Sequence, residues 1–145
     1  MTQNLNNKKI ELFVDNSIDN YRKKEGISVE EMIKIYLDNE GFFILGDEDN
    51  KMVGYLDVID LDQIRKIIKG LNEKEIYLKG DTIKDLIEKS LIKFRDTFID
   101  SNEKLIEVVR KLNDSEQIYF PVIKKDTLIG RISRRILLEK IKDLY

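Results

Sequence analysis

The sequence repeats itself, and this internal repeat limits the possible folds more than any other feature. When the chain is shifted by 73 positions, apolar residues fall on apolar residues, and later the offset grows to 76, which places Gly54 on Gly130. Such drift is expected because insertions concentrate in loops. The coinciding pairs include Ile10 with Ile83, Tyr21 with Phe94, Arg22 with Arg95, Met32 with Leu105 and Tyr36 with Val109. We therefore expect two tandem repeats, a diverged one at residues 1–70 and a second at residues 71–145, packed as one pseudo-two-fold module.

Both repeats predict the element order β-α-β-β-α, which belongs to the α+β (α/β) class. In the first repeat the last helix is expected over Leu61–Lys69, with Gly70 as its C-cap. In the second repeat Thr82 and Asp85 fit a capping box before the first helix. The elements expected there are a helix at Ile83–Lys89, an extended stretch at Arg95–Ile99, an amphipathic helix around Leu105–Leu112, a hairpin of Tyr119–Ile123 and Thr127–Ser133, and a helix from about Arg134 to the end.

Composition removes several classes of function. The 145 residues include no Cys and no His, which excludes disulfides, thiolate metal sites, cysteine nucleophiles and the commonest general base. Lys and Arg total 26 against 28 Asp and Glu, and this balance argues against a general nucleic-acid binder. The polar N-terminus lacks the apolar core expected of a signal peptide, and no apolar run approaches membrane-spanning length. We therefore expect a cytoplasmic protein with no membrane or nucleic-acid partner.

The segment from Tyr119 to Leu138 contains the main candidate site. It predicts strand, turn, strand, glycine, serine and helix, so Gly130 and Ser133 would lie at a strand-to-helix junction. Free N–H groups and the helix dipole at such a junction can hold a phosphate. Arg131, Arg134 and Arg135 surround it, and an Arg can bind a phosphate through two hydrogen bonds. Two other interpretations stay open: Ser133 as a helix cap alone, and the arginines as a solvated face or a site for an acidic partner.

Motifs in both repeats resemble those of the tandem CBS-domain pair, also called a Bateman module. In the second repeat the resemblance rests on Phe120-Pro121-Val122-Ile123 and on the run from Leu128 to Arg135, and in the first on the run from Met52 to Asp60. It covers nearly the whole chain. It implies a regulatory module, not an enzyme, that binds an adenosine-containing ligand such as AMP, ADP, ATP or S-adenosylmethionine in a cleft between the repeats. It further implies a homodimer that modulates a protein partner in trans.

The resemblance also implies which residues would bind the nucleotide, and this sequence departs from the family pattern at two of the expected positions. Ile136 occupies the position of the aspartate that would bind the ribose in the second repeat, and Asp57 replaces the expected Ser or Thr in the first. Each site is therefore incomplete, which keeps open an alternative function as a ligand-free interaction or dimerisation scaffold. The candidate nucleotide-binding residues are Gly130, Arg131, Ser133, Arg134, Thr97, Phe120, Pro121 and Asp60.

Other features have simpler explanations. Asp57 is expected to cap a helix and Asp60 to complement its dipole, while Phe42, Phe43, Phe120 and Pro121 are expected in the core rather than against adenine. Asp47–Asp49 is expected to form a hairpin turn rather than a calcium loop, and only charge density favours a magnesium site at Asp57, Asp60 and Asp62. No catalytic or metal residues are assigned. The candidate dimer faces are Ile64, Ile67 and Ile68, and Leu137, Leu138 and Ile141, and we expect at least half of these residues to pack between the repeats of one chain instead.

Overall fold

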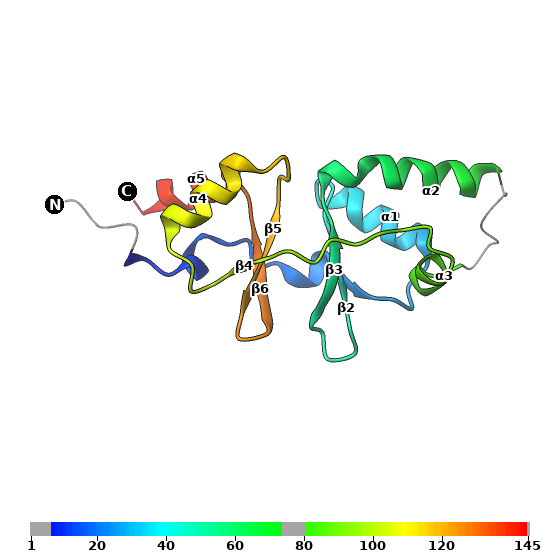
Figure 1. Cartoon of the computed structure of the whole chain (residues 1–145), viewed down its shortest axis with the longest axis horizontal. Helices are drawn as coiled ribbons and strands as arrows, with labels where there is room; N and C mark the ends of the chain where they lie inside the picture. Colours follow the sequence, from blue (N-terminus) through cyan, green and yellow to red (C-terminus); the bar gives the residue numbers. More distant parts are fainter. Residues whose placement is uncertain (1–6, 74–80, 145) are drawn as a thin grey trace. The chain divides into compact units, whose positions relative to one another are not determined.

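Two three-stranded sheets, ordered β1-β2-β3 and β4-β5-β6, form the framework of the part of the chain that the structure describes. The computed structural model describes residues 7–73 and 81–144, so the first six residues of the polar N-terminus and Tyr145 at the end of the predicted last helix lie outside it. The chain divides into two compact units (Figure 1). The first-sheet unit is Asp19–Asp96, and the second-sheet unit combines the described residues of Met1–Ile18 and Thr97–Tyr145. Each unit therefore contains residues from both sequence repeats.

In the first-sheet unit, β1 lies parallel to β2, and β2 lies antiparallel to β3. Apolar side chains of the helices and of β2 and β3 form one core, which includes Met32, Tyr36, Phe43 and Ile64. The elements are β1 (Arg22–Lys24), α1 (Val29–Asp38), β2 (Phe43–Gly46), β3 (Met52–Leu56), the 3₁₀ turn η4 (Val58–Asp60), α2 (Leu61–Glu73) and α3 (Ile83–Glu88).

The second-sheet unit repeats this arrangement, with β4 parallel to β5 and β5 antiparallel to β6. Its core takes Ile10, Phe13 and Val14 from the N-terminal segment, together with residues such as Phe120 and Leu137. The elements are the 3₁₀ helix η2 (Ile10–Phe13), β4 (Ile99–Asp100), α4 (Leu105–Asp114), β5 (Phe120–Lys124), β6 (Thr127–Ile132) and α5 (Arg134–Asp143). A further 3₁₀ turn, η3 (Ile18–Asn20), spans the junction of the two units.

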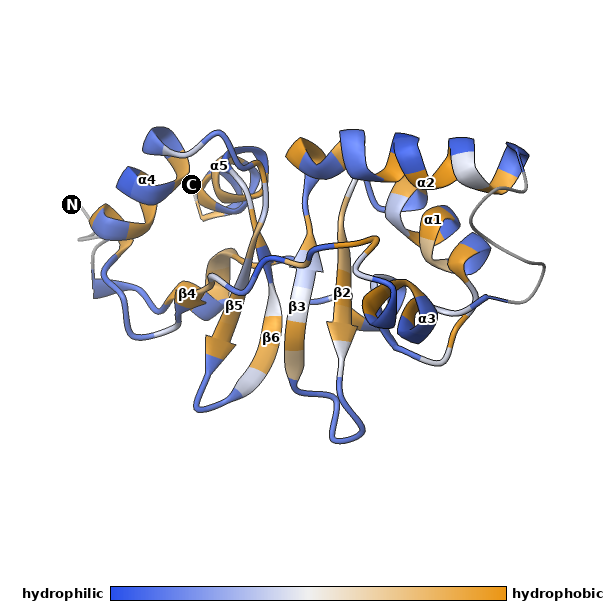
Figure 2. Cartoon of the chain, turned by 45° about the vertical axis from the view of Figure 1, so that its right-hand side comes forward, coloured by the Kyte–Doolittle hydropathy of each residue, from blue (hydrophilic) through white to orange (hydrophobic). Residues whose placement is uncertain are grey.

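Helix α3 begins where the local sequence predicts. The Thr82 N–H donates to Asp85 Oδ2 at 2.8 Å, and the Asp85 N–H donates back to Thr82 Oγ1 at 3.4 Å, which confirms the capping box before α3. The predicted end of α2 is wrong, because the helix continues through a buried Gly70 to Glu73. Leu71 packs against the core, and this tertiary contact outweighs the tendency of Gly to end a helix. Hydrophobic and hydrophilic residues alternate along α2 (Figure 2).

The predicted hairpin of the second repeat is confirmed as β5 and β6, with positive φ angles at Lys125 and Asp126 in its turn. The predicted extended stretch Arg95–Ile99 is only partly a strand: Arg95 forms an isolated bridge to Tyr55, while Ile99 pairs with Val122. This stretch thus leaves the first-sheet unit and enters the second. Within residues 7–73 and 81–144, no helix is long and apolar enough to cross a membrane.

The apolar faces considered for dimerisation pack mostly within their own units. Ile64 and Ile67 are buried in the first core, where Ile68 packs against them, and Leu137 is buried in the second core, where Ile141 packs. Their expected intramolecular role is therefore confirmed. Leu138 differs from the rest, because its side chain is 67% exposed on the outer face of α5.

Candidate functional site

The strand-to-helix junction after β6 has the predicted form. Ser133 has an extended backbone, and its Oγ accepts the Ile136 N–H at 3.1 Å, while its carbonyl accepts the Leu137 N–H at 2.9 Å. The capping role of Ser133 is therefore confirmed, and its contact with a phosphate stays a prediction. The first N–H groups of any α-helix lack partners within the helix, so this end of α5 offers donors to an anion.

Gly130 allows close approach of the protein's own backbone. A Cβ atom at this position would lie 2.5 Å from the Asp15 carbonyl oxygen and 2.9 Å from a Val14 methyl group. Asp15 and Arg131 exchange two backbone hydrogen bonds, of 2.8 and 3.0 Å, directly beside it. Any side chain at residue 130 would push the N-terminal segment away from β6.

Gly54 has the same role in the first-sheet unit. A Cβ there would lie 2.6 Å from Phe94 Cβ and 2.9 Å from the Arg95 carbonyl oxygen. Arg95 and Tyr55 exchange two backbone hydrogen bonds, of 2.8 and 2.9 Å. The repeated glycine thus admits a crossing backbone segment in both units, a role that sequence reasoning missed because the segment comes from a distant part of the chain.

Arg131 is held by groups of its own unit. Its Nε donates to Asp15 Oδ2 at 3.0 Å, and its guanidinium lies over the Tyr119 ring at 4.3 Å from the ring centre. The Arg131 side chain is only 8% exposed. The Asp15 carboxylate at one edge and the Tyr119 ring beneath hold the guanidinium in place. Arg131 could therefore contact only a ligand that reaches it in this position.

The two arginines that open α5 differ in their surroundings. Both are exposed. Arg135 lies 3.6 Å from Glu139 Oε1 and donates to the Tyr119 hydroxyl at 3.3 Å. Arg134 forms no ion pair or hydrogen bond with the described part of the chain, beyond the helix backbone. Arg134 is therefore the arginine of this junction that is most available to an anion.

The remaining candidates of the second repeat lie in the same unit. Phe120 and Pro121 are buried on β5, and Pro121 lies opposite Arg131 in the sheet register. Their expected place in the core is confirmed, as is that of Phe42 and Phe43. Thr97 is exposed just before β4. Ile136 is 6% exposed, so the position of the missing carboxylate is filled by a buried apolar side chain.

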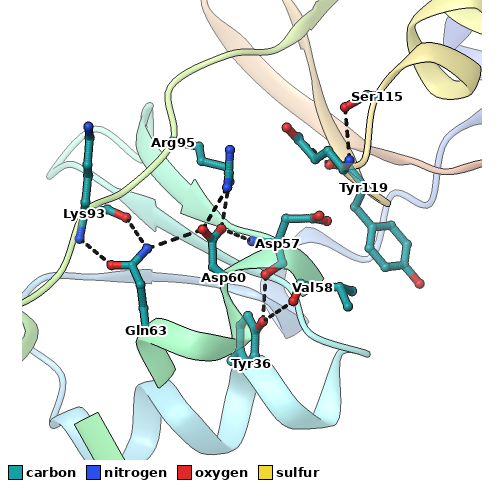
Figure 3. A network of polar contacts seen from close by, with 10 residues as sticks. Tyr36, Asp57, Val58, Asp60, Gln63, Lys93, Arg95, Ser115 and Tyr119 are labelled. Carbon is teal, nitrogen blue, oxygen red and sulfur yellow. Dashed lines mark hydrogen bonds and ion pairs between the residues drawn. The ribbon is translucent and has the colours of Figure 1, made fainter. Parts of the chain in front are cut away.

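Asp60 belongs to the other unit and is bound by Arg95. Arg95 Nε donates to Asp60 Oδ2 at 2.8 Å, and Arg95 Nη2 donates to Oδ1 at 3.0 Å (Figure 3). The Asp57 N–H donates to Oδ2 at 2.9 Å, and Gln63 Nε2 donates to Oδ1 at 3.3 Å. The hydrogen bonds to Asp60 raise the pKa of Arg95 above its usual value. With Asp60 only 5% exposed, both of its oxygens are used inside the unit.

Tyr36 completes this network. Its hydroxyl donates to the Asp57 carbonyl oxygen at 2.7 Å. Burial raises the pKa of Tyr36 far above its usual value, and the nearby carboxylates of Asp60 and Asp57 raise it further. Tyr36 therefore stays protonated and acts as a hydrogen-bond donor rather than as a general base.

The acidic clusters are explained by other contacts. Asp47 Oδ1 accepts the N–H groups of Asp49 and Lys51, which confirms a hairpin turn. Asp62 is exposed and lies 3.5 Å from Arg65. In the two described ranges, no three side chains of the metal-binding types gather closely enough to hold a metal ion.

Comparison with known proteins identifies the fold. Residues 83–143 match the model of the CBS domain family. A structure of CBSX2 in complex with AMP is 17% identical, with a TM-score of 0.67 over 94% of this chain and 97% of that one. An uncharacterised conserved protein from Pyrococcus horikoshii is 18% identical, with a TM-score of 0.66 over 97% and 96%. A structure of CbpB in complex with c-di-AMP is 15% identical, with a TM-score of 0.65 over 94% and 86%. A search of curated protein sequences found no match.

Proposed function

Because residues 83–143 match the CBS domain family and the chain has the fold of a CBS-domain pair, we propose that this protein is a regulatory module that binds an adenosine-containing ligand. The module would alter a partner protein in trans rather than catalyse a reaction. The ligand class is supported by two proteins of the same fold, one in complex with AMP and one with c-di-AMP. Cytoplasmic residence and a homodimeric state belong to the same proposal.

The observation that carries the proposal is the end of α5 at Ser133. A serine-capped helix terminus, two exposed arginines and the positive end of the helix dipole there suit a phosphate. Arg134 would contact the phosphate, since it has no partner in the described chain beyond the helix backbone. Thr97, Phe120 and Pro121 are proposed to contribute from the same unit.

The protein offers fewer available hydrogen bonds to a ribose than to a phosphate. Ile136 offers no hydrogen bond, and the Asp60 carboxylate is already engaged by Arg95 at 2.8 and 3.0 Å. Recognition of the two ribose hydroxyls would require Asp60 to lose those charged hydrogen bonds. We therefore propose that affinity depends mainly on the phosphate, so AMP, ADP or ATP should bind more tightly than S-adenosylmethionine.

The proposal can be tested by thermal denaturation with each of the four ligands. A ligand present at 100 times its Kd should add about 2.7 kcal/mol of stability. Arg134→Gln should reduce the ligand-induced shift, while Arg110→Gln, which removes another exposed arginine charge, from α4, should leave it unchanged. The absence of a shift with any of the four at millimolar concentration would contradict the ligand-binding proposal.

A ligand-free scaffold is the second candidate, and a specific observation favours it. The charged groups Asp60 and Arg131 are already bound by Arg95 and Asp15 of the same chain. In that case the wild type should bind no nucleotide, and the double variant Asp57→Ser with Ile136→Asp should gain affinity. Light scattering of the wild type would show whether the proposed homodimer exists.

A further inference from the structure

A pocket of about 350 Å³ opens on the first-sheet unit. None of its lining residues belongs to the Ser133 junction. All of its lining residues lie within Asp19–Asp96, so a single compact unit forms it. Its volume is at the lower end of the range of about 300–1,000 Å³ that small-molecule sites occupy. The pocket is lined by Gln63, Ile87, Ser90, Leu91, Ile92 and Lys93.

The wall of this pocket is fixed, although it is formed by an irregular segment. Gln63 Nε2 donates to the Lys93 carbonyl oxygen at 3.0 Å, and Gln63 Oε1 accepts the Lys93 N–H at 2.9 Å (Figure 3). At the other end of the segment, the Leu91 N–H donates to the Leu86 carbonyl oxygen at 2.9 Å. A wall held at both ends needs little ordering when a ligand binds, which lowers the cost of binding.

One side of the pocket is apolar. Ile92 is 9% exposed, whereas Ile87 leaves 39% of its surface open to solvent at the end of α3. Leu91 packs against the core from the same segment. Covering the exposed part of Ile87 with an apolar group would be favourable, because it removes apolar surface from water.

The polar side of the pocket offers donors. Neither the Lys93 ammonium nor the Ser90 hydroxyl has an ion pair or hydrogen bond within the described ranges, and both residues are exposed. The Gln63 amide is already used by Lys93 and Asp60. Asp60 in turn is neutralised by Arg95, so its charge does not oppose an anion nearby. An ammonium has only donors to give, which favours an anionic ligand group.

We propose that this pocket is a second binding site, for a small carboxylate with an apolar body. A single lysine acts as a point charge and suits a monoanion, whereas a phosphate is better matched by the planar fork of an arginine. The carboxylate would lie between Lys93 and Ser90, and the apolar body would cover Ile87. This inference does not depend on nucleotide binding, because it shares no residue with the Ser133 junction.

The test is a two-dimensional amide NMR titration of the full chain with octanoate. Resonances of Ser90 to Lys93 and the Gln63 side-chain amide should shift in a saturable way. Lys93→Gln should weaken binding about fivefold, as expected for a partly exposed ion pair, and Lys93→Arg should retain most of it. Lys66→Gln is the matched control, since it removes an exposed charge from α2 outside the pocket.

Octanol tests the role of the carboxylate, because it has the same chain without the charge. It should bind at least fivefold more weakly than octanoate. The proposal is overturned if octanoate causes no saturable shifts at 10 mM, if the shifts lie outside the pocket, or if Lys93→Gln and the wild type bind octanoate equally.

Discussion

Single residues in this protein decide which backbone segments can meet. Gly54 and Gly130 each lie where a Cβ atom would come within 3.0 Å of a crossing segment. The segments that approach them, Asp15 in one unit and Arg95 in the other, then form two backbone hydrogen bonds with the neighbouring strand. At the residue scale, the motif glycines therefore serve the fold whether or not a ligand is present.

Replacing Gly130 should test this role directly. Gly130→Ala would place a methyl group 2.5 Å from the Asp15 carbonyl oxygen, so the N-terminal segment must shift or separate from β6. We expect a loss of about 2–3 kcal/mol in the free energy of unfolding, measured by urea denaturation. Gly26→Ala is the control, because no atom lies within 4 Å of its added Cβ and it should cost almost nothing. Equal stability of the two variants would contradict the argument.

Asp15 should make the stability of the protein sensitive to acid. Burial raises the pKa of Asp15, but hydrogen bonds from Ser17 and Arg131 lower it more, so the net shift is downward from 3.8. A lowered pKa in the folded state means that the stabilisation is complete above the unfolded pKa and is lost as the pH falls through the folded value.

Asp15→Asn should therefore be less stable than the wild type near pH 6, and the difference should shrink as the pH falls below about 4. Urea midpoints measured for both proteins across this range provide the test. A difference that stays constant down to about pH 2 would show that the charge of Asp15 does not contribute.

At the scale of the elements, the Asp60–Arg95 pair fixes an irregular segment to the start of α2. The pair is bidentate, and Gln63 adds two hydrogen bonds to the backbone of Lys93. No regular strand or helix connects residues 89–98 to their surroundings. These side chains therefore add to the backbone pairing of Arg95 with Tyr55 and hold the wall of the pocket.

Replacing Arg95 should reduce the stability of the protein more than replacing Asp60. Arg95→Met leaves a 5%-exposed carboxylate without its partner and should reduce stability by about 2–3 kcal/mol. Asp60→Asn leaves a guanidinium that is 36% exposed and can still meet water, so its cost should be smaller. Urea denaturation of both variants and of the double variant Arg95→Met with Asp60→Leu provides the comparison. If Arg95→Met is no less stable than Asp60→Asn, burial of Asp60 does not control the pair.

The elements could be predicted from the sequence far better than their contacts. Caps such as Thr82 and Ser133 act within three residues, so local sequence contains the signal. Arg95 meets Asp60 across 35 positions and Arg131 meets Asp15 across 116, and no periodicity links such distant residues. The sequence therefore predicted the junction of α5 but not the partners that already hold Arg131 and Asp60. The repeated glycines are a usable signal, although Gly130 was expected to make room for a ligand rather than for another segment of the chain.

At the scale of the whole molecule, each compact unit is completed by residues from both repeats. Residues 10–14 enter the core of the second-sheet unit, and α3 enters the core of the first. The proposed repeat boundary at residue 70 therefore does not coincide with the boundaries between the compact units, which lie at residues 18/19 and 96/97. Neither repeat alone contains all the apolar residues of one core.

Cutting the chain should demonstrate this dependence. Fragments 1–73 and 81–145, produced separately, should each show little cooperative unfolding, because each lacks part of both cores. Mixed together, they should associate and recover a cooperative thermal transition detected by circular dichroism. If fragment 81–145 alone unfolded cooperatively at the same midpoint temperature as the intact chain, the residues that each repeat contributes to the other core would have no role in stability.

The position of Ile10, Phe13 and Val14 in the second core has a consequence for synthesis on the ribosome. These residues are translated well before the strands and helices that bury them, β4 to α5. At about 5–20 residues per second, the apolar N-terminal segment waits several seconds for its binding surface. During that interval its apolar side chains stay in contact with water, so we expect this segment to be more prone to aggregate in the nascent chain than in the folded protein.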